Sequence, residues 1–302
     1  MSGVPQNLAP LKILARCVAD FPTIRENVKY CASLGIKFFI PTLTPHTHEA
    51  VLVGSGPSVK TQIKNLQKKN RDRTPGGKYC FFGIKGGHDF LLENGIEPHF
   101  GIAVDPLEKI HRENFLKKAE RCTYFIASQC HPTLFDSLIA RGEQVVIWHL
   151  LTDNLLKWSQ EEGSPIFQHY FIPGGSTSGL RSIVLAYAMG FRKFHLYGYD
   201  CCLSLAKPND KKPTLRKVGG EICDGMDEKG REKAIEVFVG EGSDRRAFWA
   251  DRAMASQCTE FQQLLKSMQR DHDPFTVRAY GSGMIQHITR LLYKEGSPIC
   301  LP

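Results

Sequence analysis

The sequence has no apolar segment long enough to cross a membrane. None of its hydrophobic runs approaches the roughly 18 consecutive apolar residues that a spanning helix needs. The first residues, MSGVPQNLAPLKILAR, also lack the basic and then apolar order of a signal peptide. We therefore expect a protein of the cytoplasm, or of the host cytoplasm if a phage encodes it, without a membrane partner.

The cysteines lack the spacing of a metal or redox motif. No two of them are separated by the two residues of a CxxC pair. A chain of 302 residues is also large enough to bury a core without disulfides. We expect reduced thiols, most of them packed in the core. The ten cysteines are Cys17, Cys31, Cys80, Cys122, Cys130, Cys201, Cys202, Cys223, Cys258 and Cys300.

The overall composition is that of an ordinary globular protein with an excess of positive charge. Hydrophobic residues make up 42% and charged residues 23% of the chain, and the net charge is +8. Such a charge suggests an anionic partner, which a nucleotide, a phosphorylated metabolite or a nucleic acid could supply. The basic segment 64–78 lacks the interleaved aromatic side chains that stack on bases, so nucleic acid is not favoured. The oligomeric state is left open.

Short apolar runs alternate with segments of helical periodicity along the first two thirds of the chain. This order predicts strands buried on both faces and joined by right-handed crossovers, that is, a mostly parallel sheet with flanking helices. The expected strands are residues 50–54, 79–83, 99–104, 122–127, 144–150 and 193–198. The expected helices are residues 58–70, 86–94, 107–119, 131–141 and 176–189.

The regions on either side of this alternation differ from it in composition. The segment before it reads as short helices and a loop, and a polar, lysine-rich and glycine-rich segment after it reads as a loop or lid. The last part suggests a strand at 235–239, a long helix within 245–269 and a strand at 275–280. The predicted divisions are 1–48 (helical segment), 49–205 (nucleotide-binding core), 206–232 (basic lid or loop) and 233–302 (C-terminal extension).

The stretch VLVGSGPSVK ends the first predicted strand in a way that suits an anion. Gly54 and Gly56 allow a tight turn and a close approach of the backbone, and Ser55 and Ser58 offer hydroxyl donors. The stretch is neither of the standard nucleotide loops, because no lysine follows the last glycine directly and a third glycine is missing. A phosphate-binding loop is therefore one interpretation, and a plain tight turn with a serine cap is the other.

A second glycine and hydroxyl cluster stands at the start of a predicted helix. It consists of Gly174, Gly175, Ser176 and Thr177. Two such helix starts on one sheet could hold one nucleotide at two points, although ordinary helix capping explains the hydroxyls equally well. The strand after this helix ends in Tyr199 and Asp200, an aromatic ring for stacking and an acidic group.

Two further strand ends carry residues suited to phosphate chemistry. Asp105 follows the third predicted strand, where a carboxylate could bind Mg²⁺ or accept a proton from an attacking hydroxyl. An Asp-Pro pair is also a common opening for a turn. Lys85 and His88, in the turn KGGHD, could contact phosphate or substrate, or could simply begin a helix beside a solvated lysine.

These stretches resemble the 6-hydroxymethylpterin diphosphokinase MptE-like family, which occurs in archaeal pterin biosynthesis and in bacterial and phage proteins. The likeness covers roughly residues 50–205 and lies in VGSGPS, in KGGHDFLLENGIEPHFGIAVDP and in GGSTSGLRSIVLAYAMGFRKFHLYGYD. The same core is similar to that of the motility-associated-factor glycosyltransferases and, more distantly, to bacterial sialyltransferases. The resemblance implies an α/β, Rossmann-like core, to which the sequence pattern adds a short helical N-terminal segment and a mixed α/β C-terminal extension.

The resemblance also implies an enzyme, a nucleotide-dependent transferase with a small-molecule acceptor. The leading expectation is diphosphoryl transfer from ATP, assisted by Mg²⁺, to the hydroxymethyl group of a pterin-like ring. The alternative is a glycosyltransferase that uses a CMP-sugar or UDP-sugar. A second alternative is a nucleotide-binding module without catalysis. The expected catalytic residues are Asp105, which would also bind the metal, Asp200 and His88. The expected nucleotide-binding residues are Gly54, Ser55, Gly56, Ser58, Lys85, Gly174, Gly175, Ser176, Thr177 and Tyr199.

Overall fold

The computed structural model describes residues 19–72, 77–108, 113–206, 214–217, 231–271 and 273–302. These residues divide into two compact units that interleave along the chain. The core unit comprises Arg16–Ser55 and Gln62–Leu196, and the second unit comprises, in its described part, Gly56–Thr61 and Tyr197–Pro302. The boundaries expected from the sequence, with a core over 49–205, stay a prediction. We describe each unit by itself.

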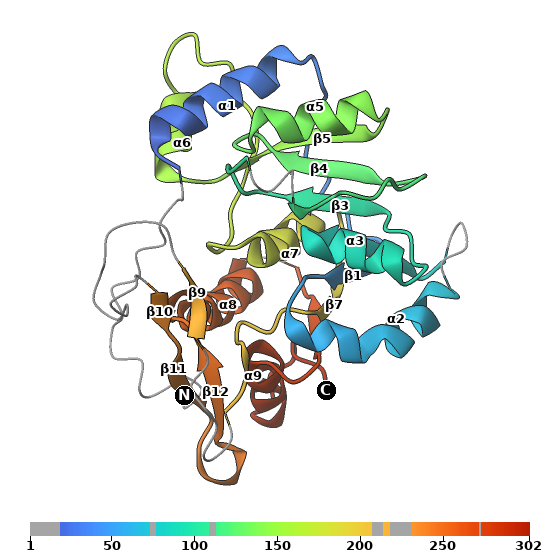
Figure 1. Cartoon of the computed structure of the whole chain (residues 1–302), viewed down its shortest axis with the longest axis vertical. Helices are drawn as coiled ribbons and strands as arrows, with labels where there is room; N and C mark the ends of the chain where they lie inside the picture. Colours follow the sequence, from blue (N-terminus) through green and yellow to red (C-terminus); the bar gives the residue numbers. More distant parts are fainter. Residues whose placement is uncertain (1–18, 73–76, 109–112, 207–213, 218–230, 272) are drawn as a thin grey trace. The chain divides into compact units, whose positions relative to one another are not determined.

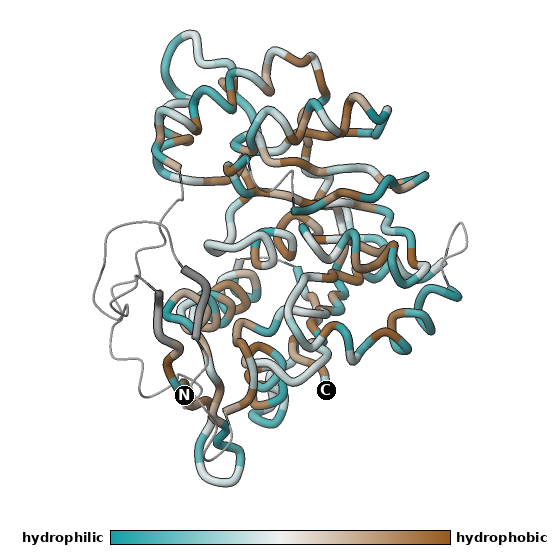
Figure 2. The backbone as a smooth tube through the Cα atoms, in the orientation of Figure 1, coloured by the Kyte–Doolittle hydropathy of each residue, from teal (hydrophilic) through white to brown (hydrophobic). Residues whose placement is uncertain are grey.

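The core unit is built on a parallel sheet (Figure 1). Its strands lie in the order β7-β1-β2-β3-β4-β5-β6, and the five pairs from β1 to β6 are all parallel. The strand residues are mostly brown in the hydropathy colouring of Figure 2, as burial on both faces requires. The sequence prediction of an α/β, Rossmann-like sheet is confirmed. The strands are β1 (Glu49–Val53), β2 (Tyr79–Ile84), β3 (Phe100–Ala103), β4 (Thr123–Ala127), β5 (Gln144–Leu150), β6 (Phe171–Ile172) and β7 (Lys193–Tyr197).

The face of the sheet on which a helix of the core unit lies follows from the direction in which the chain crosses that sheet. The chain steps outward from β1 to β6, and α7 then returns from β6 across β3, β2 and β1. Because crossovers are right-handed, this return places α7 on the face opposite to α3 and α5. The carboxyl ends of all the parallel strands therefore meet at one edge of the sheet. The helices are α1 (Phe21–Ser33), α2 (Ile63–Asn70), α3 (Gly86–Glu93), α5 (Pro132–Ala140), α6 (Asp153–Ser159) and α7 (Ser178–Ala188).

The helix expected over 107–119 is wrong in the second half of that range. Phe115 has a φ of +58°, which a helix does not allow. The amides of Leu116 and Lys117 donate to the carboxylate of Asp89, at 3.0 and 3.2 Å. A side chain from α3 thus satisfies the backbone groups that a helix would have paired, which periodicity alone does not reveal.

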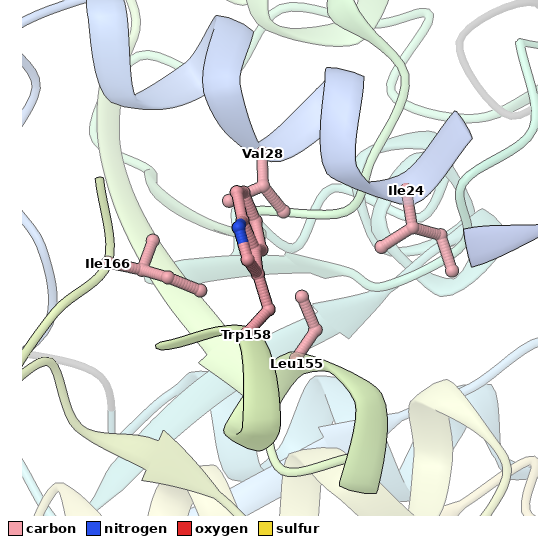
Figure 3. Close-up of a cluster of buried hydrophobic side chains, with 5 residues drawn as sticks. All are labelled: Ile24, Val28, Leu155, Trp158 and Ile166. Carbon is pink, nitrogen blue, oxygen red and sulfur yellow. The ribbon is translucent and has the colours of Figure 1, made fainter. Parts of the chain in front are cut away.

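Helix α1 is fixed to the core unit by a small apolar cluster (Figure 3). Ile24 and Val28, one turn apart on α1, face Leu155 and Trp158 on α6, together with Ile166 from the following loop. All five side chains are buried. The cluster confirms the short helical segment expected before the sheet, and it shows that α6, which periodicity had not revealed, pairs with that segment.

The second unit mixes strands and helices, as the sequence predicted for the C-terminal extension. The sheet β11-β12-β8 is antiparallel, and β9 pairs antiparallel with β10. The loop or lid expected over 206–232 lies mostly outside the described residues. The elements of the second unit are the 3-10 helix η1 (Pro57–Gln62), β8 (Ser204–Leu205), β9 (Thr214–Lys217), β10 (Arg231–Lys233), β11 (Ile235–Val239), η2 (Gly242–Asp244), β12 (Arg246–Ala250), α8 (Arg252–Asp271), β13 (Thr276–Tyr280) and α9 (Met284–Lys294). None of the helices in the described ranges combines the length and the apolar character that a membrane crossing needs.

Candidate functional site

The carboxyl ends of β2 and β3 hold an ion pair between two of the predicted site residues. Lys85 directly follows β2, and Asp105 stands two residues after β3. The Lys85 Nζ lies 2.9 Å from Asp105 Oδ2, and the two side chains keep 28% and 18% of their surface exposed. The pair is thus ordered and still reachable from solvent, as a binding or reacting group must be.

Backbone contacts fix both members of this pair. The amide of Leu107 donates to Asp105 Oδ1 at 3.2 Å, and the amide of Lys85 donates to the carbonyl of Ile102 at 3.1 Å. Lys85 has a φ of +50° and a ψ of −124°, a sparsely populated conformation that costs a residue with a Cβ about 1 to 3 kcal/mol. Local strain of this kind persists where the surrounding structure holds it, and it is often found at functional sites.

The N-terminus of α3 adjoins the ion pair. Lys85 occupies the N-cap position and makes no side-chain hydrogen bond to the first helical turn. A Cβ at Gly87 would overlap the carbonyl oxygen of Val53, so the glycine lets the helix start directly against the end of β1. The exposed Ser55 lies close by, because a Cβ at Gly86 would be 3.5 Å from the Ser55 Cβ. First-turn amides, an ammonium group and a hydroxyl are the groups that bind phosphate.

His88 has a structural place in the core. Its side chain is fully buried, with Nδ1 3.0 Å from Asp89 Oδ1 and Nε2 3.0 Å from the Tyr124 hydroxyl. Although burial opposes it, the hydrogen bonds from His88 and from two backbone amides lower the pKa of Asp89. Since both ring nitrogens are engaged inside the protein, we assign His88 no contact with ligand, and its predicted catalytic role is left without support.

In the second unit, Ser58 and Asp200 bind each other. Asp200 is 2% exposed and accepts hydrogen bonds from the Ser58 amide at 2.7 Å, the Ser58 hydroxyl at 2.5 Å and Gln286 Nε2 at 3.0 Å. The Gly56 amide donates to the Gly198 carbonyl at 3.0 Å. The carboxylate therefore caps the start of η1. The roles of Ser58 and Gly56 in holding phosphate, and of Asp200 in catalysis, stay predictions.

The contacts with Gly198 and Asp200 give another reason for Gly56, the second glycine of the VLVGSGPSVK stretch. A Cβ at Gly56 would lie 2.5 Å from the carbonyl oxygen of Gly198 and 2.6 Å from Asp200 Oδ2. The close approach that this glycine permits is thus made to the chain itself. Gly54 is buried at the end of β1, and it is the exposed Ser55 that offers a hydroxyl to solvent.

The start of α7 is held by capping and by a buried arginine. The Thr177 hydroxyl accepts from the Leu180 amide at 3.1 Å, which is the ordinary capping that the sequence left open. Arg181 donates to the carbonyl of Gly175 at 2.7 Å and lies within contact of Gly174, which has a φ of +141°. Ser176 remains exposed. The strand before this helix, β6, is separated from β1 by four others, so a ligand held at both helix starts would cross much of the sheet.

The tyrosines after the return helix lie inside the second unit. Tyr199 is 5% exposed, and the ring of Tyr197 stacks on Tyr280 with centroids 4.3 Å apart. Tyr197 therefore packs against another ring of the second unit. Base stacking by Tyr199 stays a prediction.

A buried chain of polar side chains escaped the sequence analysis. Ser128 follows β4, and its hydroxyl lies 2.8 Å from His149 Nδ1 on β5, while His149 Nε2 lies 2.9 Å from His169 Nδ1. The ring of Phe38 stacks on His149, with centroids 5.1 Å apart. Burial, followed by the neighbouring His169, lowers the pKa of His149 to about 3. The one signal in the sequence was a histidine within the apolar run QVVIWHL.

The described residues do not assemble a metal site of their own. No group of three or more His, Cys, Asp or Glu side chains among them is placed to hold a metal ion. Asp105 is a single carboxylate, and Lys85 already neutralises it. Mg²⁺ is often bound through one carboxylate together with substrate phosphates, so Asp105 stays the predicted ligand for it.

Comparison with protein families agrees with the resemblance that the sequence motifs suggested. A family model described as 6-hydroxymethylpterin diphosphokinase MptE-like matches residues 23–205, more than half of the chain. This chain belongs to the MptE-like family. The match includes the Lys85 and Asp105 pair and the starts of α3 and α7. No match was found among the curated proteins.

Among solved structures, this MptE-like chain is similar to the MAf glycosyltransferase of Magnetospirillum magneticum AMB-1. The TM-score is 0.55 at 13% sequence identity, over 91% of this chain and 42% of the other. The chain thus spans about two fifths of the length of that protein. At this identity the likeness shows a shared fold and nothing finer.

Proposed function

We propose that this MptE-like protein is a nucleotide-dependent transferase whose phosphate-binding groups lie at the carboxyl ends of β1 and β2. The observation that carries the proposal is the Lys85 to Asp105 pair, 2.9 Å apart, at the N-terminus of α3, where the N-cap residue makes no side-chain hydrogen bond to the first turn. The ammonium group and the first-turn amides bind phosphate oxygens, and Ser55 adds a hydroxyl. The carboxylate of Asp105 accepts the proton of the acceptor hydroxyl.

The leading reaction is diphosphoryl transfer from ATP to a hydroxymethyl group on a pterin-like ring. The hydroxyl oxygen attacks the β-phosphorus, a new oxygen to phosphorus bond forms, and the bond from the β-phosphorus to the bridging oxygen of AMP breaks. The hydroxyl proton passes to Asp105. Such a reaction depends on positioning and on charge neutralisation, which a lysine and a helix N-terminus supply. Mg²⁺, when bound with the nucleotide, would add to that neutralisation. The family match supports this choice of reaction.

Glycosyl transfer from a nucleotide sugar is the second candidate. The observation in its favour is the fold shared with a MAf glycosyltransferase. The nucleotide phosphates would use the same groups, and Asp105 would accept the proton of a sugar or protein hydroxyl. The two reactions differ in the bond that breaks, which lies between phosphorus and oxygen in the first case and between the sugar carbon and oxygen in the second.

The test separates the proton acceptor from the phosphate ligand. With ATP and a hydroxymethylpterin, release of AMP is measured for the wild type, Asp105→Asn and Lys85→Met. We expect Asp105→Asn to lower turnover by about 100-fold or more, since general base catalysis contributes roughly 10²-fold to 10⁴-fold. It should keep the thermal stabilisation by nucleotide. Lys85→Met should lose that stabilisation.

Lys117→Met is the matched control, because Lys117 is a half-exposed lysine of the same unit that pairs with Glu93 on the surface. It should behave as the wild type in both measurements. Full turnover by Asp105→Asn would remove Asp105 from the chemistry. Unchanged nucleotide binding by Lys85→Met would show that phosphate is held elsewhere. Hydrolysis of a sugar nucleotide without AMP release from ATP would favour the second candidate.

A further inference from the structure

The second unit holds two cysteine thiols in contact. Cys201 directly follows Asp200, and Cys258 lies on α8. The two thiols are within hydrogen-bonding contact of each other. The Cys201 Sγ also lies 3.6 Å from Oε1 of Gln257, the residue that precedes Cys258 on the same helix. Two independent contacts thus place Cys201 against this turn of α8.

The surroundings of the two thiols differ in a way that suits sequential oxidation. Cys201 is partly exposed, whereas Cys258 is fully buried. Cys201 has a φ of +49°, a conformation unusual for a residue with a Cβ. Burial, followed by the hydrogen bond with Cys201, raises the pKa of Cys258 well above its usual range, so this thiol does not react first.

We propose that Cys201 and Cys258 form a reversible disulfide when the protein meets a peroxide. The Cys201 thiolate attacks one oxygen of hydrogen peroxide, a sulfur to oxygen bond forms, the O–O bond breaks, and hydroxide leaves and takes up a proton to become water. The sulfur of Cys258 then attacks the Cys201 sulfenic acid. The disulfide forms, the sulfur to oxygen bond breaks, and the hydroxide that leaves takes the Cys258 proton as a second water. Both sulfurs are oxidised and the peroxide is reduced.

The site of this modification adjoins the hydrogen bonds that hold η1. The Asp200 carboxylate, one residue before Cys201, binds Ser58 and Gln286. A covalent bond from Cys201 to α8 would restrain the backbone that carries Asp200. The proposal itself depends only on the two thiols and is independent of the transferase function.

The experiment uses the full-length protein. The reduced protein is titrated with hydrogen peroxide, alkylated under denaturing conditions and digested, and its peptides are identified by mass spectrometry with fragment ions that separate Cys201 from Cys202. We expect loss of two alkylatable thiols per chain, a cross-linked peptide joining Cys201 to Cys258, and full recovery of both thiols after dithiothreitol. The measurement on the wild type needs no substitution and cannot fail through misfolding.

Two variants test whether the cross-link involves Cys201 in particular. Cys201→Ser should lose the cross-link, whereas Cys80→Ser, which removes a partly exposed thiol of the core unit, should keep it. The proposal is overturned if Cys201 is oxidised to sulfinic acid while Cys258 remains alkylatable. It is equally overturned if Cys258 cross-links to another cysteine in the wild type, or if neither thiol changes at peroxide levels that oxidise Cys80.

Discussion

The most consequential single residue outside the proposed site is His149. It lies 1% exposed in the interior, where the desolvation of a positive charge is costly, and it is kept neutral with a pKa of about 3. Both ring nitrogens have partners, Ser128 on one side and His169 on the other. A neutral imidazole can accept one hydrogen bond and donate the other, so both contacts are satisfied in the uncharged state.

His149 makes the folded protein sensitive to acid. The unfolded imidazole has its ordinary pKa near 6.5, so below that pH the unfolded state binds more protons and stability falls until pH approaches about 3. At a pH about two units below 6.5, this one group should cost about 3 kcal/mol, at 1.36 kcal/mol for each unit. The measurement is urea unfolding from pH 7 downward for the wild type and His149→Gln.

The variant should show a flatter decline in unfolding free energy over this range, because it lacks the titrating ring. Ser128→Ala is the control, since it removes a hydrogen-bond partner but keeps the imidazole, and it should retain the acid decline. Parallel declines for the wild type and His149→Gln would mean that other groups, such as the carboxylates of Glu49 and Asp89 with their lowered pKa values, account for the loss.

At the scale of elements, the groups that cap the start of each helix distinguish structural residues from functional ones. The start of η1 is capped by the buried carboxylate of Asp200, and the start of α7 by Thr177 and Arg181. The N-cap residue of α3, Lys85, makes no side-chain hydrogen bond to the first turn of that helix and pairs with Asp105 instead. A capped helix has its first amides partly satisfied, whereas an uncapped one offers them to an anion.

Asp200→Asn and Asp105→Asn should therefore fail in different ways. The first substitution would place an amide NH₂ group opposite hydrogen-bond donors, and hydrogen bonds to a charged group contribute about 1.5 to 3 kcal/mol each. We expect Asp200→Asn to lower the free energy of unfolding by about 2 kcal/mol or more. Asp105→Asn should lower it by about 1 kcal/mol or less, since the pair with Lys85 is partly solvated.

Thermal and urea unfolding of the two variants give this comparison directly, with turnover measured in parallel. Equal stability of both variants, together with a selective loss of turnover in Asp200→Asn, would return Asp200 to the catalytic role that its place at a strand end first suggested.

For the whole molecule, the identity of the donor is the open choice between the two proposed reactions. A ligand that binds only the native state at 100 times its Kd adds about 2.7 kcal/mol, which a thermal shift detects. We expect stabilisation by ATP with Mg²⁺ in a panel that also contains GTP, UDP-sugars and CMP-sugars. Lys85→Met should abolish the shift. Stabilisation by a sugar nucleotide alone would favour glycosyl transfer. The absence of a thermal shift with every ligand of the panel would contradict nucleotide binding.

The local pattern of the sequence was sufficient for the parallel sheet. The run 144–150 became β5 with the predicted bounds, because short apolar runs between turn residues have few other ways to bury themselves. The turns after β1, β2 and β3 were also placed correctly, with Lys85 and Asp105 at neighbouring strand ends. Helix α9, by contrast, was not predicted, although its residues follow the glycine turn with helical periodicity.

The sequence by itself determined the alternation of strands and helices that builds the parallel sheet, the edge of that sheet where polar loops gather, and the family. Only the tertiary structure decided which polar atoms at that edge have partners inside the protein. Ser58 and Asp200 are 142 positions apart, and His149 and His169 are 20 apart, yet each pair shares a hydrogen bond. Propensity and periodicity act within a few residues, whereas such partners are brought together by strand register and packing, which no local pattern encodes.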